Sequence, residues 1–278
     1  MPGAPGRWIK ASLRGAFFVA ALVVALAAGP GRADCPADRS DEPVRVQHVY
    51  DGDSLTLADG RRVRLIGINT PERGRDGARD QPLALAARDR LRQMLFATGM
   101  RARLRYGSQR RDRHDRLLAH LFLPDGRNAA AVLLEAGLGW HVAIPPNLWS
   151  LDCYAGAEAR ARAARRGVWG RPEYRPLDAA RLDLRREGFA LVQGVLRQVR
   201  DRRGRRHLRI GRLRADIPLA ELSYFPDPPG RHWIGRRLEL RGWLWRARGE
   251  MRVMLHHPAM LRRLDTGNRP PQKPSVQP

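Results

Sequence analysis

Short stretches in which apolar and polar residues alternate dominate the chain from position 44 to position 123. The dipeptides Asp51-Gly52 and Asp59-Gly60 separate the first three stretches, and a Pro-Asp-Gly turn follows the last. Alternation over a few residues, bounded by Asp-Gly or Pro, is typical of half-buried β-strands. The pattern therefore predicts five strands, at Val44–Tyr50, Ser54–Ala58, Arg61–Ile68, Arg101–Tyr106 and Leu117–Leu123.

Helical spacing of apolar residues occurs three times in and after this region. It is clear between Gln81 and Ala97, where the apolar residues fall on one side. Asn128 can cap a second helix that Gly137 would end, since Asn favours N-caps and Gly favours the position after a helix. A third helix is expected over Tyr154–Arg166. Short strands with about three helices predict a mostly β fold, in which helices pack on a small barrel.

A second β-rich region follows the first. Residues 171–187 form a linker rich in Pro and Arg, of which residues 177–186 are predicted to be helical. The tail, residues 266–278, is Pro-rich and polar and is predicted to be disordered. The two predicted modules are therefore residues 42–170 and a smaller one at residues 188–265. The expected strands of the second module are Phe189–Arg200, His207–Leu213, Arg237–Ala247 and Met251–His256.

The N-terminus has the pattern of a targeting segment. Basic residues precede an apolar run at positions 16–29, and the small residues Gly31 and Ala33 follow it. The run is shorter than the ~20 residues that a helix needs to cross a bilayer. The pattern predicts a secretory signal peptide over residues 1–33, with export to the periplasm or the medium and no membrane attachment after cleavage. An uncleaved membrane anchor is the alternative.

The composition indicates what kind of partner the chain binds and which protein classes are excluded. Lys and Arg number 52 against 28 Asp and Glu, a formal net charge of +24, which favours a polyanionic partner or an anionic surface. Hydrophobic residues make up 43% of the chain, enough for a buried core. Two Cys exclude a disulfide-framework miniprotein and a Cys-rich zinc module. In an oxidising compartment Cys35 and Cys153 are expected to pair, the alternative being two unrelated thiols.

Three short segments concentrate charged residues at strand ends. Asp51 and Asp53 flank a tight turn and offer oxygen ligands for a hard cation. Arg64 lies in an apolar row of its strand, so its guanidinium needs an anionic partner. Glu72 follows a stiff Pro turn, and Arg116 precedes the fifth strand. Each segment alone reads as an ordinary turn or solvated charge run, but together they can bind a divalent metal and cleave a phosphodiester.

In this order the segments resemble the thermonuclease (staphylococcal nuclease-like) family. The counterparts of its motifs are Val49–Ser54, Arg64–Glu72 and Asp112–Ala119. The resemblance covers about residues 42–170 and implies an OB-fold barrel of five strands and about three helices. It also implies a Ca²⁺-dependent nuclease that hydrolyses DNA or RNA with low sequence specificity. The second module loosely resembles accessory OB-type domains that bind nucleic acid.

The resemblance implies a role for each site residue. Glu72 is the implied general base that activates water, while Arg64 and Arg116 hold the phosphoryl group and stabilise its charge. The implied Ca²⁺ ligands are Asp53, Asn69 and the carbonyl of Thr70, with Asp51 close behind. The implied substrate contacts are Arg113 and His114. No stable protein partner is implied, and a monomer is expected.

Several residues depart from the family's pattern; Ser54 in place of Thr is a minor change, and His114 stands where the family often has an aromatic residue. Asn69 stands where the family usually has Asp, so Ca²⁺ should bind more weakly and another divalent cation could be preferred. Asp115 replaces a Gly next to Arg116, where its carboxylate would either orient or neutralise the guanidinium. These departures support the alternative function: a catalytically weak or inactive OB-fold protein that binds nucleic acid or envelope polyanions.

Aromatic residues in the second module raise a separate possibility. Trp243 and Trp245 share one face of a predicted strand that also carries arginines. Such a face can bind single strands by stacking. Inward packing of both indoles in the core is the alternative.

Overall fold

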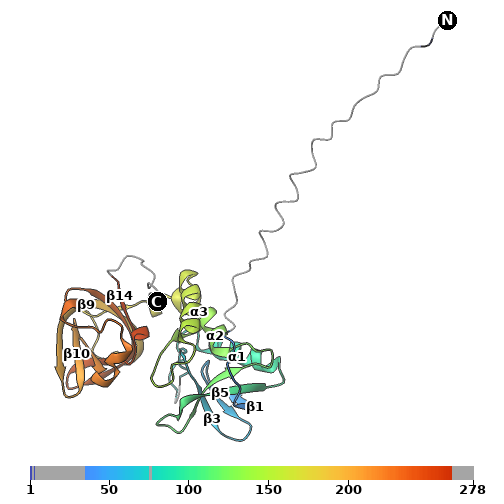
Figure 1. The fold of residues 1–278 in the computed structure, drawn as a ribbon, viewed down its shortest axis with the longest axis horizontal. Helices are drawn as coiled ribbons and strands as arrows, with labels where there is room; N and C mark the ends of the chain where they lie inside the picture. The colour runs from blue at the N-terminus through green and yellow to red at the C-terminus, as the bar shows by residue number, and fades with distance from the viewer. Residues whose placement is uncertain (2, 4–34, 75–76, 265–278) are drawn as a thin grey trace, which may run out of the picture. The chain divides into compact units, whose positions relative to one another are not determined.

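The computed structural model describes residues 1, 3, 35–74 and 77–264 (Figure 1). The chain divides into two units, residues 1–32 and 33–278, and the fold lies in the second. Almost all of the predicted signal peptide, at residues 1–33, and the predicted disordered tail, at residues 266–278, lie outside the described residues. None of the helices in the described part of the chain is long and apolar enough to span a membrane.

A closed five-stranded barrel forms the first module, in the order β1-β2-β3-β6-β5. Only the β3–β6 pairing is parallel, and the other neighbours are antiparallel. Val63 and Leu65 are buried on β3 whereas Arg64 between them faces outward, which is the alternation seen in the sequence. The strands are β1 (Glu42–Val49), β2 (Ser54–Leu57), β3 (Arg62–Leu65), β5 (Arg101–Arg111) and β6 (Leu117–Phe122).

Three helices and a small two-stranded sheet complete this module. The helices are α1 (Ala84–Phe96), α2 (Ala129–Glu135) and α3 (Leu151–Ala163), and α2 contacts both of the others (Figure 1). Asn128 caps α2 as predicted, because its side chain accepts a hydrogen bond from the amide of Ala131. The strands β4 (Ile68–Asn69) and β7 (Trp140–His141) pair with each other. The predicted mostly β barrel with about three helices is confirmed.

A disulfide joins Cys35 to Cys153, two residues that are 118 positions apart. Cys35 is buried in the core of the first module, and Cys153 belongs to α3. The bond therefore ties the segment ahead of β1 to the last helix of the module. The predicted pairing is confirmed.

Replacing both cysteines, Cys35→Ser with Cys153→Ser, is expected to lower the free energy of unfolding by about 4 kcal/mol, since the crosslink restricts a long loop in the unfolded chain. Denaturant unfolding of the oxidised wild type and the double variant measures the difference. The reduced wild type is the control and should unfold like the variant. Equal stability of all three proteins would contradict the prediction.

The second module is also built on a barrel. Its sheet has the order β14-β12-β13-β11-β10-β9-β8, and an additional pairing of β12 with β9 closes it. The interior is a separate hydrophobic cluster that includes Leu196, Leu208, Leu213 and Met251. The strands are β8 (Leu177–Asp178), β9 (Gly188–Arg202), β10 (Arg205–Ile210), β11 (Leu213–Pro218), β12 (Arg237–Ala247), β13 (Glu250–Met254) and β14 (Leu261–Arg263). The 3₁₀ helices within residues 35–74 and 77–264 are η2 (Gly167–Trp169), η3 (Pro172–Tyr174), η4 (Leu219–Tyr224), η5 (Arg231–Trp233) and η6 (Pro258–Met260).

Two predictions for this region are wrong. Residues 177–186 of the linker do not form a helix: β8 pairs in parallel with β9, and the amide of Ala179 donates to the carbonyl of Gln193 at 2.8 Å. Leu182 is buried in the second core, so tertiary pairing and burial override the local helical spacing. The predicted strand His207–Leu213 is in fact two strands, because Gly211 turns the chain at a positive φ of 55°.

Trp243 and Trp245 do not pack inward in the core of the second module, and base stacking by them stays a prediction. Leu244 between them is buried in the core, so Trp243 and Trp245 lie on the outer face of β12. Both are half-buried, and the ring of Trp243 contacts Phe189 edge-on, with ring centroids 5.1 Å apart.

Candidate functional site

Segments from three parts of the first barrel meet around Arg64. This residue faces outward from β3, and its side chain is 13% exposed. One terminal nitrogen pairs with Asp53 Oδ1 in the β1–β2 turn, and the other, Nη2, donates to Asn69 Oδ1 on β4 at 3.0 Å. The predicted anionic partner of Arg64 is therefore Asp53. The guanidinium connects the β1–β2 turn with β3 and β4.

Burial lowers the pKa of Arg64 to about 10, so the guanidinium stays protonated at neutral pH. Neighbouring carboxylates oppose this effect and a second guanidinium adds to it. The charged groups that act on the pKa are Asp51, Glu72, Arg116 and Asp112. The charged residues predicted from the three sequence segments therefore share one electrostatic environment.

The β1–β2 turn is rigid around Asp53. Oδ2 of Asp53 accepts hydrogen bonds from the amide and hydroxyl of Thr70, at 2.7 and 3.1 Å, and its own amide donates to Asp51 Oδ1 at 3.0 Å. Both aspartates and Thr70 are buried. Gly52 is required between the aspartates, because a Cβ there would lie 2.7 Å from the side chains of Ala87 and Thr70.

The oxygens near Arg64 are suited to a hard divalent cation. Asp53 Oδ1 and Asn69 Oδ1 converge on the same guanidinium, and the carboxylate of Asp51 is adjacent in the turn. Carboxylate and amide oxygens are ligands that Ca²⁺ and Mg²⁺ prefer. Within residues 35–74 and 77–264 there is no cluster of three or more His, Cys, Asp or Glu that could hold a metal. A cation here would therefore need further ligands from water or substrate, and it would compete with Arg64 for the two oxygens.

Arg116 is held by Asp112, which begins the motif Asp112–Ala119 but was not among the predicted site residues. Nε of Arg116 donates to Asp112 Oδ2 at 2.7 Å, and the amide of Arg116 donates to Oδ1 at 3.0 Å. Burial raises the pKa of Asp112, but these hydrogen bonds outweigh it and the pKa is lowered overall. The Arg116 side chain remains 28% exposed, so it can still contact a ligand.

Asp115 neither orients nor neutralises Arg116 in this structure. Its carboxylate accepts a hydrogen bond from Nη1 of Arg111 at 2.8 Å and is 78% exposed. Its backbone has a φ of 60°, a conformation that Gly adopts at no steric cost. The Gly that the family usually has at this position is therefore explained by backbone geometry. The concern that Asp115 weakens the site is not supported.

Glu72 lies in the loop after β4, and Gln81 holds its backbone from both sides. The amide of Glu72 donates to Gln81 Oε1 at 2.9 Å, and the amide of Gln81 donates to the carbonyl of Glu72 at 3.0 Å. Pro71 before it is buried, whereas Glu72 itself is exposed. The loop thus presents a carboxylate at the surface with a fixed main chain.

Arg113 and His114 lie at the exposed tip of the β5–β6 turn that also carries Arg116. Nε of Arg113 contacts Nε2 of His114 at 3.1 Å, and Arg62 donates to the carbonyl of His114 at 2.7 Å. Their contact with substrate stays a prediction.

A known protein family and several known proteins resemble part of this chain. Residues 62–171 match the family model described as staphylococcal nuclease homologue. The chain is 30% identical over 171 residues to the thermonuclease of Staphylococcus intermedius, a match that covers 59% of this chain and 100% of that protein. It is 26% identical over 171 residues to the thermonuclease of Staphylococcus hyicus, covering 58% of this chain and 99% of that protein. An uncharacterized endonuclease of Escherichia coli O157:H7 is 31% identical over 102 residues, which cover 34% of this chain and 58% of that protein.

The matches with the two staphylococcal proteins run over essentially their whole length. The family model coincides with the part of the chain that holds β3, β4 and the turn of Arg116. The first module has the predicted barrel, and Asp51, Glu72 and Arg116 act electrostatically on Arg64. The chain belongs to the staphylococcal nuclease family.

Proposed function

We propose that this chain is a metal-dependent nuclease that hydrolyses phosphodiester bonds of DNA or RNA with low sequence specificity. The observation that carries the proposal is the convergence of Asp53 and Asn69 on Arg64, with Glu72 and Arg116 in the same electrostatic environment. Similarity to proteins named thermonuclease and endonuclease supports it. The net charge of +24 suits a polyanionic substrate.

In the proposed mechanism two arginines hold the scissile phosphate. Attack on phosphorus builds negative charge on the non-bridging oxygens, where planar guanidinium groups that stay protonated act best. Asp53 orients Arg64, and Asp112 orients Arg116. Because these partners fix both side chains before substrate arrives, little reorganisation is needed during the reaction.

Glu72 is the proposed general base. Its exposed carboxylate accepts the proton of the water whose oxygen attacks phosphorus, so that a bond forms to the water oxygen as the bond to the leaving oxygen breaks. Gln81 supports this role, because it holds the backbone of Glu72 on both sides.

Asp53, Asn69, the carbonyl of Thr70 and Asp51 are the proposed residues for Ca²⁺ or another divalent cation. When bound, such a cation would add positive charge next to the phosphoryl oxygens. With Asn69 in place of a carboxylate the set carries less negative charge, so the affinity for Ca²⁺ should be modest.

A cleavage assay with Ca²⁺, Mg²⁺, Mn²⁺ or a chelator, on single- and double-stranded substrates, tests the proposal. Cleavage with Ca²⁺ or another of these cations, abolished by the chelator, is the expected result. The matched variant Asn69→Asp should reach half-maximal activity at a lower Ca²⁺ concentration. Binding without cleavage under every condition, with no rise of the melting temperature in Ca²⁺, would favour the nucleic-acid or polyanion binder instead.

We also propose that the protein is exported to the periplasm or the medium. The basic, apolar and small-residue pattern of residues 1–33 and the disulfide between Cys35 and Cys153 support this, since such bonds persist in oxidising compartments. Mass spectrometry of the protein from separated cell fractions tests it. A chain that begins at Asp34 is expected, and a full-length chain in the membrane fraction would indicate an anchor.

The two acidic residues of the β5–β6 turn should differ in their effect on cleavage. Asp112→Asn is expected to lower kcat/KM by about 10- to 100-fold, because Arg116 loses the carboxylate that positions it. Asp115→Asn is the matched control and should change kcat/KM by less than about threefold, since its ion pair is exposed and involves Arg111. Steady-state kinetics on one oligonucleotide measures both. Similar losses in the two variants would contradict the assigned partners.

A further inference from the structure

The two barrels share one strand topology. In the first, the order is β1-β2-β3-β6-β5, with β1 also paired to β5 and a parallel pairing between β3 and β6. In the second, the corresponding order is β9-β10-β11-β13-β12, with β12 paired to β9 and a parallel pairing between β11 and β13. The strands therefore correspond one to one, β3 with β11 and β6 with β13.

The ladder register extends this correspondence to single residues. In the first barrel, Val63 is paired with both Leu55 and Leu117. In the second, Leu213 is paired with both Ile210 and Met251. All six of these residues are buried. The residues next to them correspond as well: Arg214 to Arg64, Arg209 to Ser54, Leu208 to Asp53, and Glu250 to Arg116.

The second barrel therefore lacks the proposed catalytic set. Leu208, which is buried in the core, stands where the first barrel has the carboxylate of Asp53. Glu250 stands where the first barrel has the guanidinium of Arg116, and a carboxylate repels a phosphate. Only the arginine on the third strand is common to both, as Arg64 and Arg214. The face that corresponds to the proposed nuclease site is thus not a second catalytic centre.

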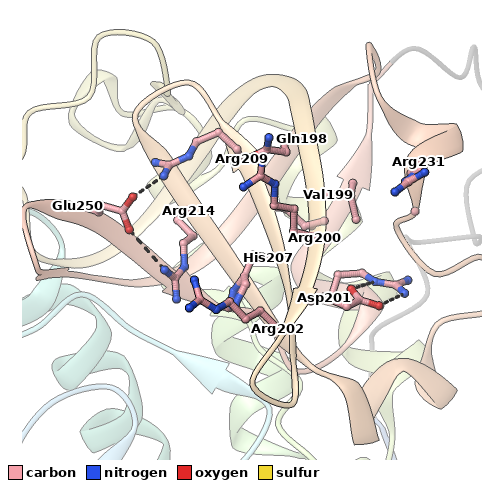
Figure 2. Close-up of a pocket in the computed structure, with 13 residues that line it drawn as sticks. Gln198, Val199, Arg200, Asp201, Arg202, His207, Arg209, Arg214, Arg231 and Glu250 are labelled. Atoms are coloured by element: carbon pink, nitrogen blue, oxygen red, sulfur yellow. Dashed lines mark hydrogen bonds and ion pairs between the residues drawn. The ribbon is translucent and has the colours of Figure 1, made fainter.

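This face is nevertheless hollowed and basic. A groove of about 730 Å³ runs over β9, β10 and β11 (Figure 2). Two acidic residues, Asp201 and Glu250, line it together with a larger number of arginines. The arginines that line this arginine groove are Arg200, Arg202, Arg206, Arg209, Arg214 and Arg231.

Internal partners account for half of these arginines. Arg206 pairs with Asp201 at 2.8 Å, Arg209 pairs with Glu250, and Arg214 pairs with Asp216 at 2.8 Å (Figure 2 shows Arg209 with Glu250).

The other half carries charge that no carboxylate neutralises. Arg200, Arg202 and Arg231 are exposed, and no acidic partner of theirs is found in the described part of the chain. Nη2 and Nε of Arg200 lie 3.0 and 3.2 Å from the side-chain amide of Gln198, a group without charge. The groove thus offers three guanidinium groups to a ligand, two from β9 and one from η5, next to arginines of β10 and β11 that ion pairs hold in place.

We propose that the arginine groove binds the phosphate backbone of the nucleic acid that the first barrel cleaves, and so retains the substrate without cutting it; the identity of the ligand rests on the proposed function. Trp, Tyr and Phe are absent from the lining, so contacts to phosphates and not base stacking carry the binding. Trp243 and Trp245 do not line the groove either. Binding is then independent of sequence and falls steeply with salt.

The test uses the full mature chain in the E72Q background, with a 5′-fluorescein-labelled single strand of twenty thymidylates. Fluorescence anisotropy over a series of salt concentrations gives the dissociation constant, and a gel confirms that the strand stays intact. The groove variant combines R200E, R202E and R231E. The matched control combines R212E, R236E and R246E, which changes the net charge equally at exposed positions outside the groove.

The groove variant is expected to bind at least about tenfold more weakly at moderate salt, and its plot of log affinity against log salt should be less steep by about 2, the value for three lost phosphate contacts on a single strand. The control should change affinity by less than about threefold. A milder variant, R200Q with R202Q and R231Q, should lie in between and guards against a loss caused by misfolding. Circular dichroism checks the fold of each.

Equal losses in the groove variant and the control would overturn the proposal, because net charge alone would then explain binding. Unchanged binding of the strand by the groove variant would overturn it too. This holds even if the groove variant lost binding to anionic lipid vesicles in a parallel assay, because the groove would then bind lipid and not nucleic acid. Anisotropy reports binding and not hydrolysis. The result therefore stands whether or not the first barrel cleaves DNA, which separates failure of this proposal from failure of the proposed function.

Discussion

Glu72→Gln is expected to lower the rate of phosphodiester cleavage by about 10²- to 10⁴-fold, the usual contribution of a positioned general base. Gln has nearly the same size and shape as Glu but cannot accept the proton of the attacking water. The main chain at position 72 should keep its place, because its two hydrogen bonds to Gln81 use the amide and the carbonyl of residue 72 and not its side chain. The loss should therefore appear in kcat, while the affinity for nucleic acid stays the same.

Steady-state cleavage and anisotropy on the same oligonucleotide separate these quantities. Glu173→Gln is the matched control, since Glu173 is an exposed glutamate in η3, outside the candidate site. The control should cleave at the wild-type rate, and both variants should melt at the wild-type temperature. If E72Q kept its kcat within about threefold, Glu72 would not be the base.

The strands of the first barrel could be predicted because two independent signals agree there. Burial alternates along β3, and the turn dipeptides fall at the strand ends. The residues of the candidate site can be predicted for the same reason, since Asp53, Arg64 and Arg116 each lie at or beside a strand end. The local sequence contains both the strand pattern and the position of the charged residues relative to it.

Contacts within the site could not be predicted in this way. The sequence predicts Asn69 as a cation ligand and Arg64 as a phosphate contact. The hydrogen bond between the two side chains could not be predicted, because it depends on the path of the chain from β3 to β4. Gln81 lies nine positions after Glu72, and no local pattern indicates that its side chain accepts the hydrogen bond of the Glu72 amide. The spacing of Asp112 and Arg116 is a usable signal, since residues four apart can meet across a tight turn.

The second barrel was harder because tertiary pairing decides its secondary structure. The helical spacing of residues 177–186 is overridden by the pairing of β8 with β9. The correspondence of Arg214 to Arg64 is visible only in the ladders, since the residues around the two arginines differ. A topology shared by two unlike sequences needs coordinates to be seen.

Arg64→Lys is expected to lower kcat more than Arg116→Lys, by about 10³-fold against about 10²-fold, the range seen when one donor to a developing oxyanion is removed. A single ammonium group cannot contact both Asp53 and Asn69 while it also holds a phosphate, whereas the guanidinium has separate nitrogens for these tasks. Among the described residues, Asp112 is the one ion-pair partner of Arg116, so Lys can replace Arg116 with less disturbance.

Kinetics on one oligonucleotide give kcat and KM for both variants, and a rise in KM with kcat unchanged would mean that the arginines bind substrate without stabilising the transition state.

A second readout follows from the geometry of Arg64. Because its guanidinium and a cation use the same oxygens of Asp53 and Asn69, Arg64→Ala should bind Ca²⁺ more tightly than the wild type does. The shift of the melting temperature with Ca²⁺ measures this, with Arg116→Ala as the matched control. Equal shifts in the two variants would mean that the cation and Arg64 do not compete for these oxygens.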